Sequence, residues 1–247
     1  MPMSHSNRPR PIFSLLSCFT LNVALCVKSR VPKLASPWGF RITEALREGG
    51  ARAIEFTDRG PGAWSVFSTL TAAAARHDRE AILGAGSIRD AYAADRFIAA
   101  GARFIVGPSF SADVARLCNT RRIPYLPGCA TATEIVTAEE SGVELVKVFP
   151  GDTLGAAFVR AIRGPLPETQ VVVTGGVAAT EASVNQWIGA GAACLGFGSA
   201  LVSRAHTSPD GAADPADLTA AVARLIDLVA AARAGASSGV LVKESRS

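Results

Sequence analysis

Residues 103–149 read RFIVGPSFSADVARLCNTRRIPYLPGCATATEIVTAEESGVELVKVF. Short runs rich in β-branched and aromatic residues alternate here with longer alanine-bearing runs of helical period. The stretch therefore predicts strands at 103–107, 123–126 and 143–149, with helices at 111–121 and 132–140 between them. Such alternation is typical of parallel strands joined by right-handed helical crossovers.

The same alternation continues on both sides of this stretch. Further strands are predicted at 52–57, 81–85, 170–174 and 193–197. Further helices are predicted at 40–48, 62–77, 89–100, 154–162, 180–189 and 217–234. Glycines stand directly after several helices, where a left-handed residue commonly ends the helix: Gly49-Gly50, Gly101, Gly142 and Gly191.

Seven strands are visible in this pattern, and Leu21–Val27 is the candidate for an eighth. We therefore predict an α/β protein with one (β/α)8 barrel, known as a TIM barrel. The alternative is an open doubly wound sheet, although no Gly-x-Gly-x-x-Gly follows the first strand to support it.

The chain of 247 residues has the length of one such barrel, which we place at 38–235. Residues 1–37 would form an N-terminal tail with the uncertain first strand, and residues 236–247 a C-terminal tail. The N-terminal segment has no Asp or Glu, so a targeting segment or a misassigned start codon are alternatives to a loose tail. Its apolar run contains Asn22 and several hydroxyl residues, which makes it a poor membrane span. We expect a cytoplasmic protein without a membrane partner.

The formal net charge of +4 is a property of the N-terminal region. Six of the 25 basic residues precede the first acidic residue, Glu44, and the remaining 19 face 21 acidic residues. A basic face on the main domain is therefore not expected, nor is a nucleic-acid partner. The five cysteines include no Cys-x-x-Cys pair, and the three histidines have no ligand-like neighbours, so neither a disulfide framework nor a metal site is predicted.

Lys147 lies within the apolar strand predicted at 143–149. It shares one side of that strand with Leu145 and Phe149, and Val146 and Val148 face the other side. Burial disfavours the ammonium form and favours a nucleophilic free amine, which can attack a ketone and form an iminium. The alternative is structural: a lysine at a strand end that reaches water or pairs with a carboxylate.

Glu55 is a carboxylate within the strand at 52–57, on the same side as Ala53 and Thr57. It lies near the carboxyl end of the strand, where the active sites of barrels are assembled. It could serve as a general acid/base or merely as the counter-ion of Lys147. Arg59 follows, and its guanidinium could hold a substrate carboxylate or pair with Asp58 or another surface acid.

Two glycine-bearing loops follow the last two predicted strands: Thr174-Gly175-Gly176-Val177 and Gly196-Phe197-Gly198-Ser199. Backbone N–H groups exposed by glycine at the start of a helix suit a phosphate or carboxylate. The loops after strands seven and eight are the recurrent phosphate site of such barrels. Taken singly, a Gly-Gly pair is more often an ordinary turn.

Taken together, these segments resemble the family of 2-keto-3-deoxy-6-phosphogluconate (KDPG) and 4-hydroxy-2-oxoglutarate (KHG) aldolases. The resemblance covers roughly residues 40–202, in order and at matching spacing. The matching stretches are Gly49 to Arg59, Gly84 to Ser87, Phe104 to Pro108, Pro124 to Thr131, Val146 to Gly151, Thr174 to Val177 and Gly196 to Ser199.

The resemblance implies a class I aldolase that needs neither metal nor cofactor. It assigns Lys147 as the Schiff-base lysine and Glu55 as the general acid/base. It assigns Arg59 and Thr174 as contacts of the pyruvate carboxylate and substrate. The implied pocket walls are Ser87, Pro108 and Phe149, and the implied cradle for a distal phosphate or carboxylate is Gly175, Gly176, Gly198 and Ser199.

The implied substrate is a small 2-keto acid, KDPG, KHG or both, which is cleaved to pyruvate and an aldehyde. The resemblance also implies a homotrimer. Val173 replaces a proline that is frequent in the family, and Ala200 replaces a tryptophan; both bear on the shape of the phosphate pocket. The alternatives are a phosphosugar isomerase or epimerase on the same barrel and a non-catalytic binder of sugar acids.

Overall fold

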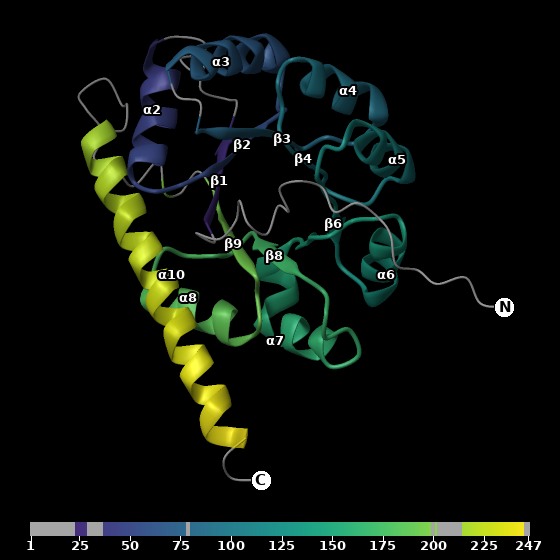
Figure 1. The fold of residues 1–247 in the computed structure, drawn as a ribbon, viewed down its shortest axis with the longest axis vertical. Helices are drawn as coiled ribbons and strands as arrows, with labels where there is room; N and C mark the ends of the chain where they lie inside the picture. Colours follow the sequence, from purple (N-terminus) through teal and green to yellow (C-terminus); the bar gives the residue numbers. More distant parts are fainter. Residues whose placement is uncertain (1–22, 29–36, 78–79, 199–200, 202–213, 245–247) are drawn as a thin grey trace, which may run out of the picture.

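A computed structural model of the protein describes residues 23–28, 37–77, 80–198, 201 and 214–244 (Figure 1). Most of the predicted tail over 1–37 lies outside the described residues, and so do Leu21 and Asn22 at the start of the predicted first strand. The candidate cradle residue Ser199 also lies outside them.

All strand pairings in the described part of the chain are parallel. The strands are β1 (Val23–Lys28), β2 (Ala53–Thr57), β3 (Ile82–Gly86), β4 (Ile105–Val106), β5 (Tyr125–Leu126), β6 (Gly128–Cys129), β7 (Val146–Val148), β8 (Val171–Thr174) and β9 (Cys194–Phe197). Their hydrogen-bonded order is β5-β4-β3-β2-β1-β9-β8-β7-β6. This order begins and ends on one stretch of chain, because only Pro127 separates β5 from β6.

Backbone hydrogen bonds join this stretch to both of its neighbours. On one side Ile105 N donates to Pro124 O at 2.9 Å, and on the other Lys147 N donates to Pro127 O at 2.9 Å. Pro127 has no N–H to donate, which interrupts the ladder between the two short strands. The order is that of an eight-stranded (β/α)8 barrel and not that of the alternative doubly wound sheet.

Helices surround the strands (Figure 1). They are α2 (Pro37–Glu48), α3 (Ala63–His77), α4 (Ala91–Ala99), α5 (Ala112–Arg121), α6 (Ala132–Glu140), α7 (Gly151–Arg163), α8 (Glu181–Gly189) and α10 (Pro215–Glu244). The last helix, α10, packs against both α8 and α2, so it joins the end of the helical layer to its beginning. Among the described residues, no helix is both long enough and apolar enough to cross a membrane.

The predicted eighth strand is confirmed over its described part. β1 pairs with β2 on one side and β9 on the other, with Leu25 in register with both Ile54 and Phe197. Each predicted helix also has a counterpart, although only α6 has both of its predicted bounds. Helix α10 continues to Glu244, beyond the predicted end at 234, and α7 begins at Gly151, with the non-helical Gly155 inside it.

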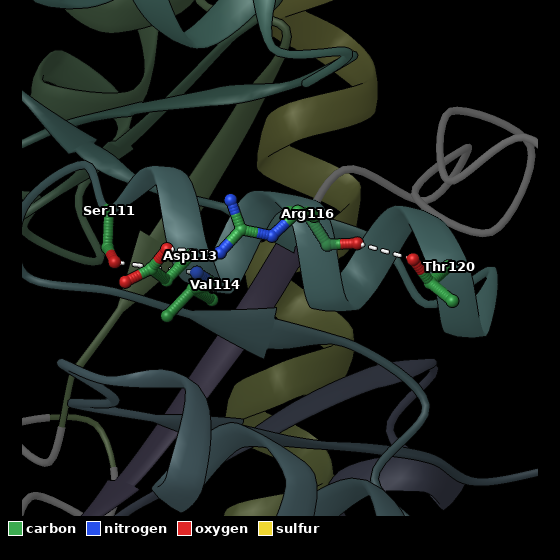
Figure 2. Close-up of polar contacts among 5 residues, drawn as sticks. All are labelled: Ser111, Asp113, Val114, Arg116 and Thr120. Carbon is green, nitrogen blue, oxygen red and sulfur yellow. Dashed lines mark hydrogen bonds and ion pairs between the residues drawn. The ribbon is translucent and has the colours of Figure 1, made fainter.

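The predicted helix-ending glycines are confirmed as left-handed residues. Positive φ angles of 99°, 102°, 85° and 97° occur at Gly50, Gly101, Gly142 and Gly191. At the other end, α5 begins with a side-chain cap, since Ser111 Oγ accepts from Val114 N at 3.4 Å (Figure 2). These caps fix where the capped helices start or end relative to the strands.

Apolar side chains form two separate layers. Alternate strand residues such as Ile54, Phe56, Val146 and Val148 belong to the large core cluster that also contains the helix residues. A smaller cluster fills the interior of the ring of strands: Ala53, Phe104, Val106, Leu126, Leu145, Val172 and Cys194. The alternation of strand residues thus decides which side chains face the interior.

Gly84 makes room for the largest residue of the interior cluster. A Cβ atom on Gly84 would lie 2.3 Å from the ring of Phe104. We expect Gly84→Ala to lower the free energy of unfolding by about 1–3 kcal/mol, because the aromatic ring must move within a packed layer. Urea unfolding measures this change.

Gly189→Ala is the matched control. Gly189 is helical, and no atom lies within 4 Å of a Cβ added there. The free energy of unfolding of Gly189→Ala should therefore be unchanged or slightly raised. Equal stability of Gly84→Ala and the wild type would contradict the packing of Phe104 against Gly84.

Candidate functional site

Lys147 is buried in the middle of β7, with only 6% of its surface exposed. Leu145, two residues earlier on the same side of the strand, belongs to the interior cluster. Lys147 therefore faces the interior of the ring. It lies nearer to the carboxyl ends of the strands than the apolar layer does. Its Nζ atom lies 4.4 Å from the ring centroid of Phe149, which is half-buried and next on that side.

Glu55 is buried on β2, with 7% of its surface exposed. Ala53, two residues earlier, belongs to the interior cluster, so Glu55 also faces the interior above the apolar layer. Three strands lie between β2 and β7 in either direction around the ring, because β5 and β6 together count as one strand. Glu55 and Lys147 thus reach inward from opposite walls of the ring.

Gly86 makes room for the carboxylate of Glu55. A Cβ atom on Gly86 would lie 1.8 Å from Glu55 Oε1, so the glutamate side chain lies directly over this glycine. Glu55 is in register with Gly84, and its carboxylate reaches two residues further along β3. The sequence prediction missed Gly86, although the alternation of glycines in Gly84-Ala85-Gly86 was a usable signal.

The structure brings Arg59 and Ser87 together at the carboxyl ends of β2 and β3. Arg59 Nε donates to Ser87 Oγ at 3.4 Å, and Arg59 is exposed. Ser87 has a φ of 65°, in the left-handed region. Asp58 N donates to Gly86 O at 2.7 Å, which extends the strand pairing up to the residue before Arg59. The side chains of Arg59 and Ser87 thus form a polar pair at the carboxyl end of the ring, which we call the rim.

The loop after β8 packs closely against the start of α7. Gly175 and Gly176 have φ angles of 94° and 70°. A Cβ atom on Gly176 would lie 2.5 Å from Asp152 Cβ, and one on Gly151 would lie 2.6 Å from Gly175 O. Only glycine fits these positions, so the loop is a backbone surface. The sequence prediction also did not include Gly151 among the site residues, although this residue packs against the loop.

The remaining candidates also lie at the carboxyl ends of strands. Thr174 ends β8, and its Oγ1 lies 2.4 Å from where a Cβ on Gly196 of β9 would be. Gly198 follows β9 and is exposed. Pro108 follows β4 and is half-buried, with its carbonyl oxygen 2.2 Å from a Cβ placed on Gly128. Apart from Ser199, every predicted site residue is therefore described at this end of the ring.

The described thiol groups are buried and not part of this site. Cys118, Cys129 and Cys194 form no disulfide among the described residues. Burial raises the pKa of both Cys118 and Cys129 to about 12, so their thiolates are scarce at neutral pH. The Lys147 side chain, in contrast, is one of the candidate site residues and faces the interior of the ring.

Known proteins are similar to this chain in sequence. A family model described as KDPG and KHG aldolase matches residues 39–213. The 2-dehydro-3-deoxy-6-phosphogalactonate aldolase of Escherichia coli (strain K12) is 32% identical over 181 residues, which cover 70% of this chain and 86% of that protein.

Solved structures show the same similarity. The 2-keto-3-deoxy-6-phosphogluconate aldolase of Zymomonas mobilis ZM4 with 3-phosphoglycerate has a TM-score of 0.71 and 25% identity, covering 85% of this chain and 93% of that one. A cube-shaped protein cage designed by fusing symmetric oligomeric domains has a TM-score of 0.76 and 25% identity, covering 91% of this chain and 78% of that one.

Proposed function

The chain belongs to the family of KDPG and KHG aldolases, which are carbon–carbon lyases, and we propose that it works through a Schiff base on Lys147. The proposed reaction cleaves KDPG, KHG or both to pyruvate and an aldehyde, glyceraldehyde 3-phosphate or glyoxylate. The observation that carries this proposal is the burial of Lys147 inside the ring of strands, with Glu55 on the opposite wall.

The first step is capture of the keto group by Lys147. The unprotonated amine attacks C2 of the substrate and forms a carbinolamine, which takes up a proton and loses water to give an iminium. Once formed, the iminium carries positive charge near the Phe149 ring, whose face attracts a cation.

The second step is cleavage of the bond between C3 and C4. Glu55, directly or through a water, accepts the proton of the C4 hydroxyl, and the aldehyde leaves. The bonding electrons move into the iminium and give an enamine. Protonation of the enamine at C3 and hydrolysis of the imine then release pyruvate and restore the Lys147 amine.

The rim residues bind the two ends of the substrate. The Arg59 guanidinium, next to Ser87, suits the carboxylate beside C2. The backbone N–H groups around Gly175 and Gly176 suit a distal phosphate or carboxylate, next to the first turn of α7. In this proposal Thr174 also contacts the substrate, and Gly198 and Ser199 complete the distal cradle. The pocket walls are Ser87, Pro108 and Phe149.

Borohydride trapping tests the nucleophile. Pyruvate with borohydride should add a stable mass to the peptide that contains Lys147, because reduction converts the imine to a secondary amine. Lys147→Ala should abolish the added mass and lower cleavage on the order of a thousandfold or more. Mass spectrometry and a lactate-dehydrogenase-coupled assay measure the two effects.

The same assay discriminates the alternatives. An isomerase, an epimerase or a non-catalytic binder would release no pyruvate and would not be trapped at Lys147. Unchanged turnover in Lys147→Ala would refute the assigned nucleophile. Assaying KDPG, its galactonate epimer and KHG side by side then identifies the substrate.

Gly86→Ala tests the position of the general acid/base. The added methyl group occupies the place of the Glu55 carboxylate, so we expect cleavage to fall by about 10²–10⁴-fold. The obstacle is the mobile end of a side chain, so the melting temperature should stay near that of the wild type.

Glu55→Gln is the reference for this variant, and Gly189→Ala is the control for a harmless glycine replacement. The double variant with Glu55→Gln and Gly86→Ala should be no slower than Glu55→Gln alone. Full activity of Gly86→Ala would show that Glu55 does not act from the position described.

We also infer a homotrimer. Support comes from the resemblance to the family and from the similarity to a cage designed by fusing symmetric oligomeric domains. Light scattering should give three times the chain mass of 25.5 kDa. A monomer mass at micromolar concentration would contradict it.

A further inference from the structure

A cluster of aromatic and cationic side chains lies beside the proposed carboxylate contact. We call Trp64, Tyr92 and Arg96 the Arg–aromatic cluster; Trp64 lies in the first turn of α3, and the other two lie on α4. Arg96 Cζ is 4.8 Å from the ring centroid of Trp64 and 5.7 Å from that of Tyr92. Trp64 Nε1 also donates to the backbone oxygen of Arg96 at 3.1 Å.

Asp58 lines the same pocket as the cluster. The pocket has a volume of about 360 Å³ and also contains Gly60, Gly62 and Phe97 among its lining residues. Burial raises the pKa of Asp58, whereas the guanidinium groups of Arg96 and Arg89 oppose that rise by favouring the carboxylate. Asp58, at the start of the β2–α3 loop, and Arg96 therefore line one pocket with opposite charges.

Three phenylalanine rings in tilted and edge-on contact reach the pocket of the cluster, which Phe97 lines. The ring centroids of Phe56 and Phe67 are 5.5 Å apart, and those of Phe67 and Phe97 are 5.2 Å apart. These rings come from β2, α3 and α4, and all three residues are buried. The helices that carry Trp64 and Arg96 are thus held against the strand that carries Glu55.

The loop between Asp58 and Trp64 contains two glycines in the left-handed region. Gly60 and Gly62 have φ angles of 111° and 83°, and no atom lies within 4 Å of a Cβ added at either residue. Arg59 lies inside this loop and reaches Ser87, whereas its neighbour Asp58 lines the pocket of the cluster. The two ends of the loop are held, and Arg59 projects from between them.

We propose that the Arg–aromatic cluster positions Arg59. Trp64 and Tyr92 hold the Arg96 guanidinium, Arg96 attracts Asp58, and the loop then presents Arg59 to the substrate carboxylate. Arg96, Trp64 and Asp58 are positioning residues in this account, because they act through Arg59. The inference rests on the proposed function, in which Arg59 binds that carboxylate.

Arg96→Ala should raise the pyruvate concentration needed for half-maximal trapping at Lys147 by about three- to tenfold. The KM for cleavage should rise equally, with kcat within about twofold, because carboxylate binding is weakened before the chemical step. Arg96→Lys should restore part of the loss, because it keeps the charge. Trp64→Phe, which removes the donor to Arg96 O but keeps an aromatic ring, should give a smaller effect in the same direction.

Arg116→Ala is the matched control. Arg116 is an exposed arginine on the next helix, α5, where it pairs with Asp113 at 2.5 Å (Figure 2). Its removal should change neither the pyruvate dependence nor KM. A fall in melting temperature without a change in KM for Arg96→Ala would mean a purely structural role and would overturn the proposal.

A double-mutant cycle tests whether Arg96 acts through Arg59. In an Arg59→Ala background, Arg96→Ala should have no further effect on the pyruvate dependence. Additive effects would overturn the proposal, as would an Arg59→Ala variant that binds pyruvate normally. Failure of the wild type to be trapped at Lys147 would instead refute the proposed function, so the two failures are distinguishable.

Discussion

Two ionisable side chains reach into the ring of strands above a layer of apolar residues, and the rest of the site depends on keeping them there. Lys147 and Glu55 are each less than a tenth exposed. Removing such groups from water is costly unless partners or chemistry compensate. The fold contributes opposite walls, so that both groups face a shared interior rather than separate surfaces.

Small residues provide the room that this arrangement requires. Gly84 and Gly86 face the interior from β3, where the first accommodates the Phe104 ring and the second the Glu55 carboxylate. Gly175 and Gly176 fulfil a different need, since close packing against α7 leaves no space for side chains there. The glycines of this chain therefore shape the proposed site as much as its charged residues do.

Much of this fold follows from local pattern. Alternating strands and helices, and helix-ending glycines such as Gly101 and Gly142, predicted the barrel because each signal is confined to neighbouring residues. The alternation within single strands also placed Lys147 and Glu55 on the sides that prove to face the interior. The first strand was harder, because β1 is identified by its pairing with β2 and β9 rather than by its own residues.

Contacts between distant residues could not be predicted in this way. Trp64 and Arg96 are 32 positions apart and meet only because α3 and α4 are neighbours around the ring. The place of the Glu55 carboxylate over Gly86 likewise depends on strand register. Local patterns identify candidate groups, and the three-dimensional pairing determines which of them act together.

A crystal structure of the protein soaked with pyruvate tests the central claim most directly. The account predicts continuous density from Lys147 Nζ to C2 of pyruvate inside the ring, with the carboxylate at Arg59 and Glu55 facing the adduct. Pyruvate bound without a covalent link, or a Lys147 amine turned to solvent away from Glu55, would contradict it.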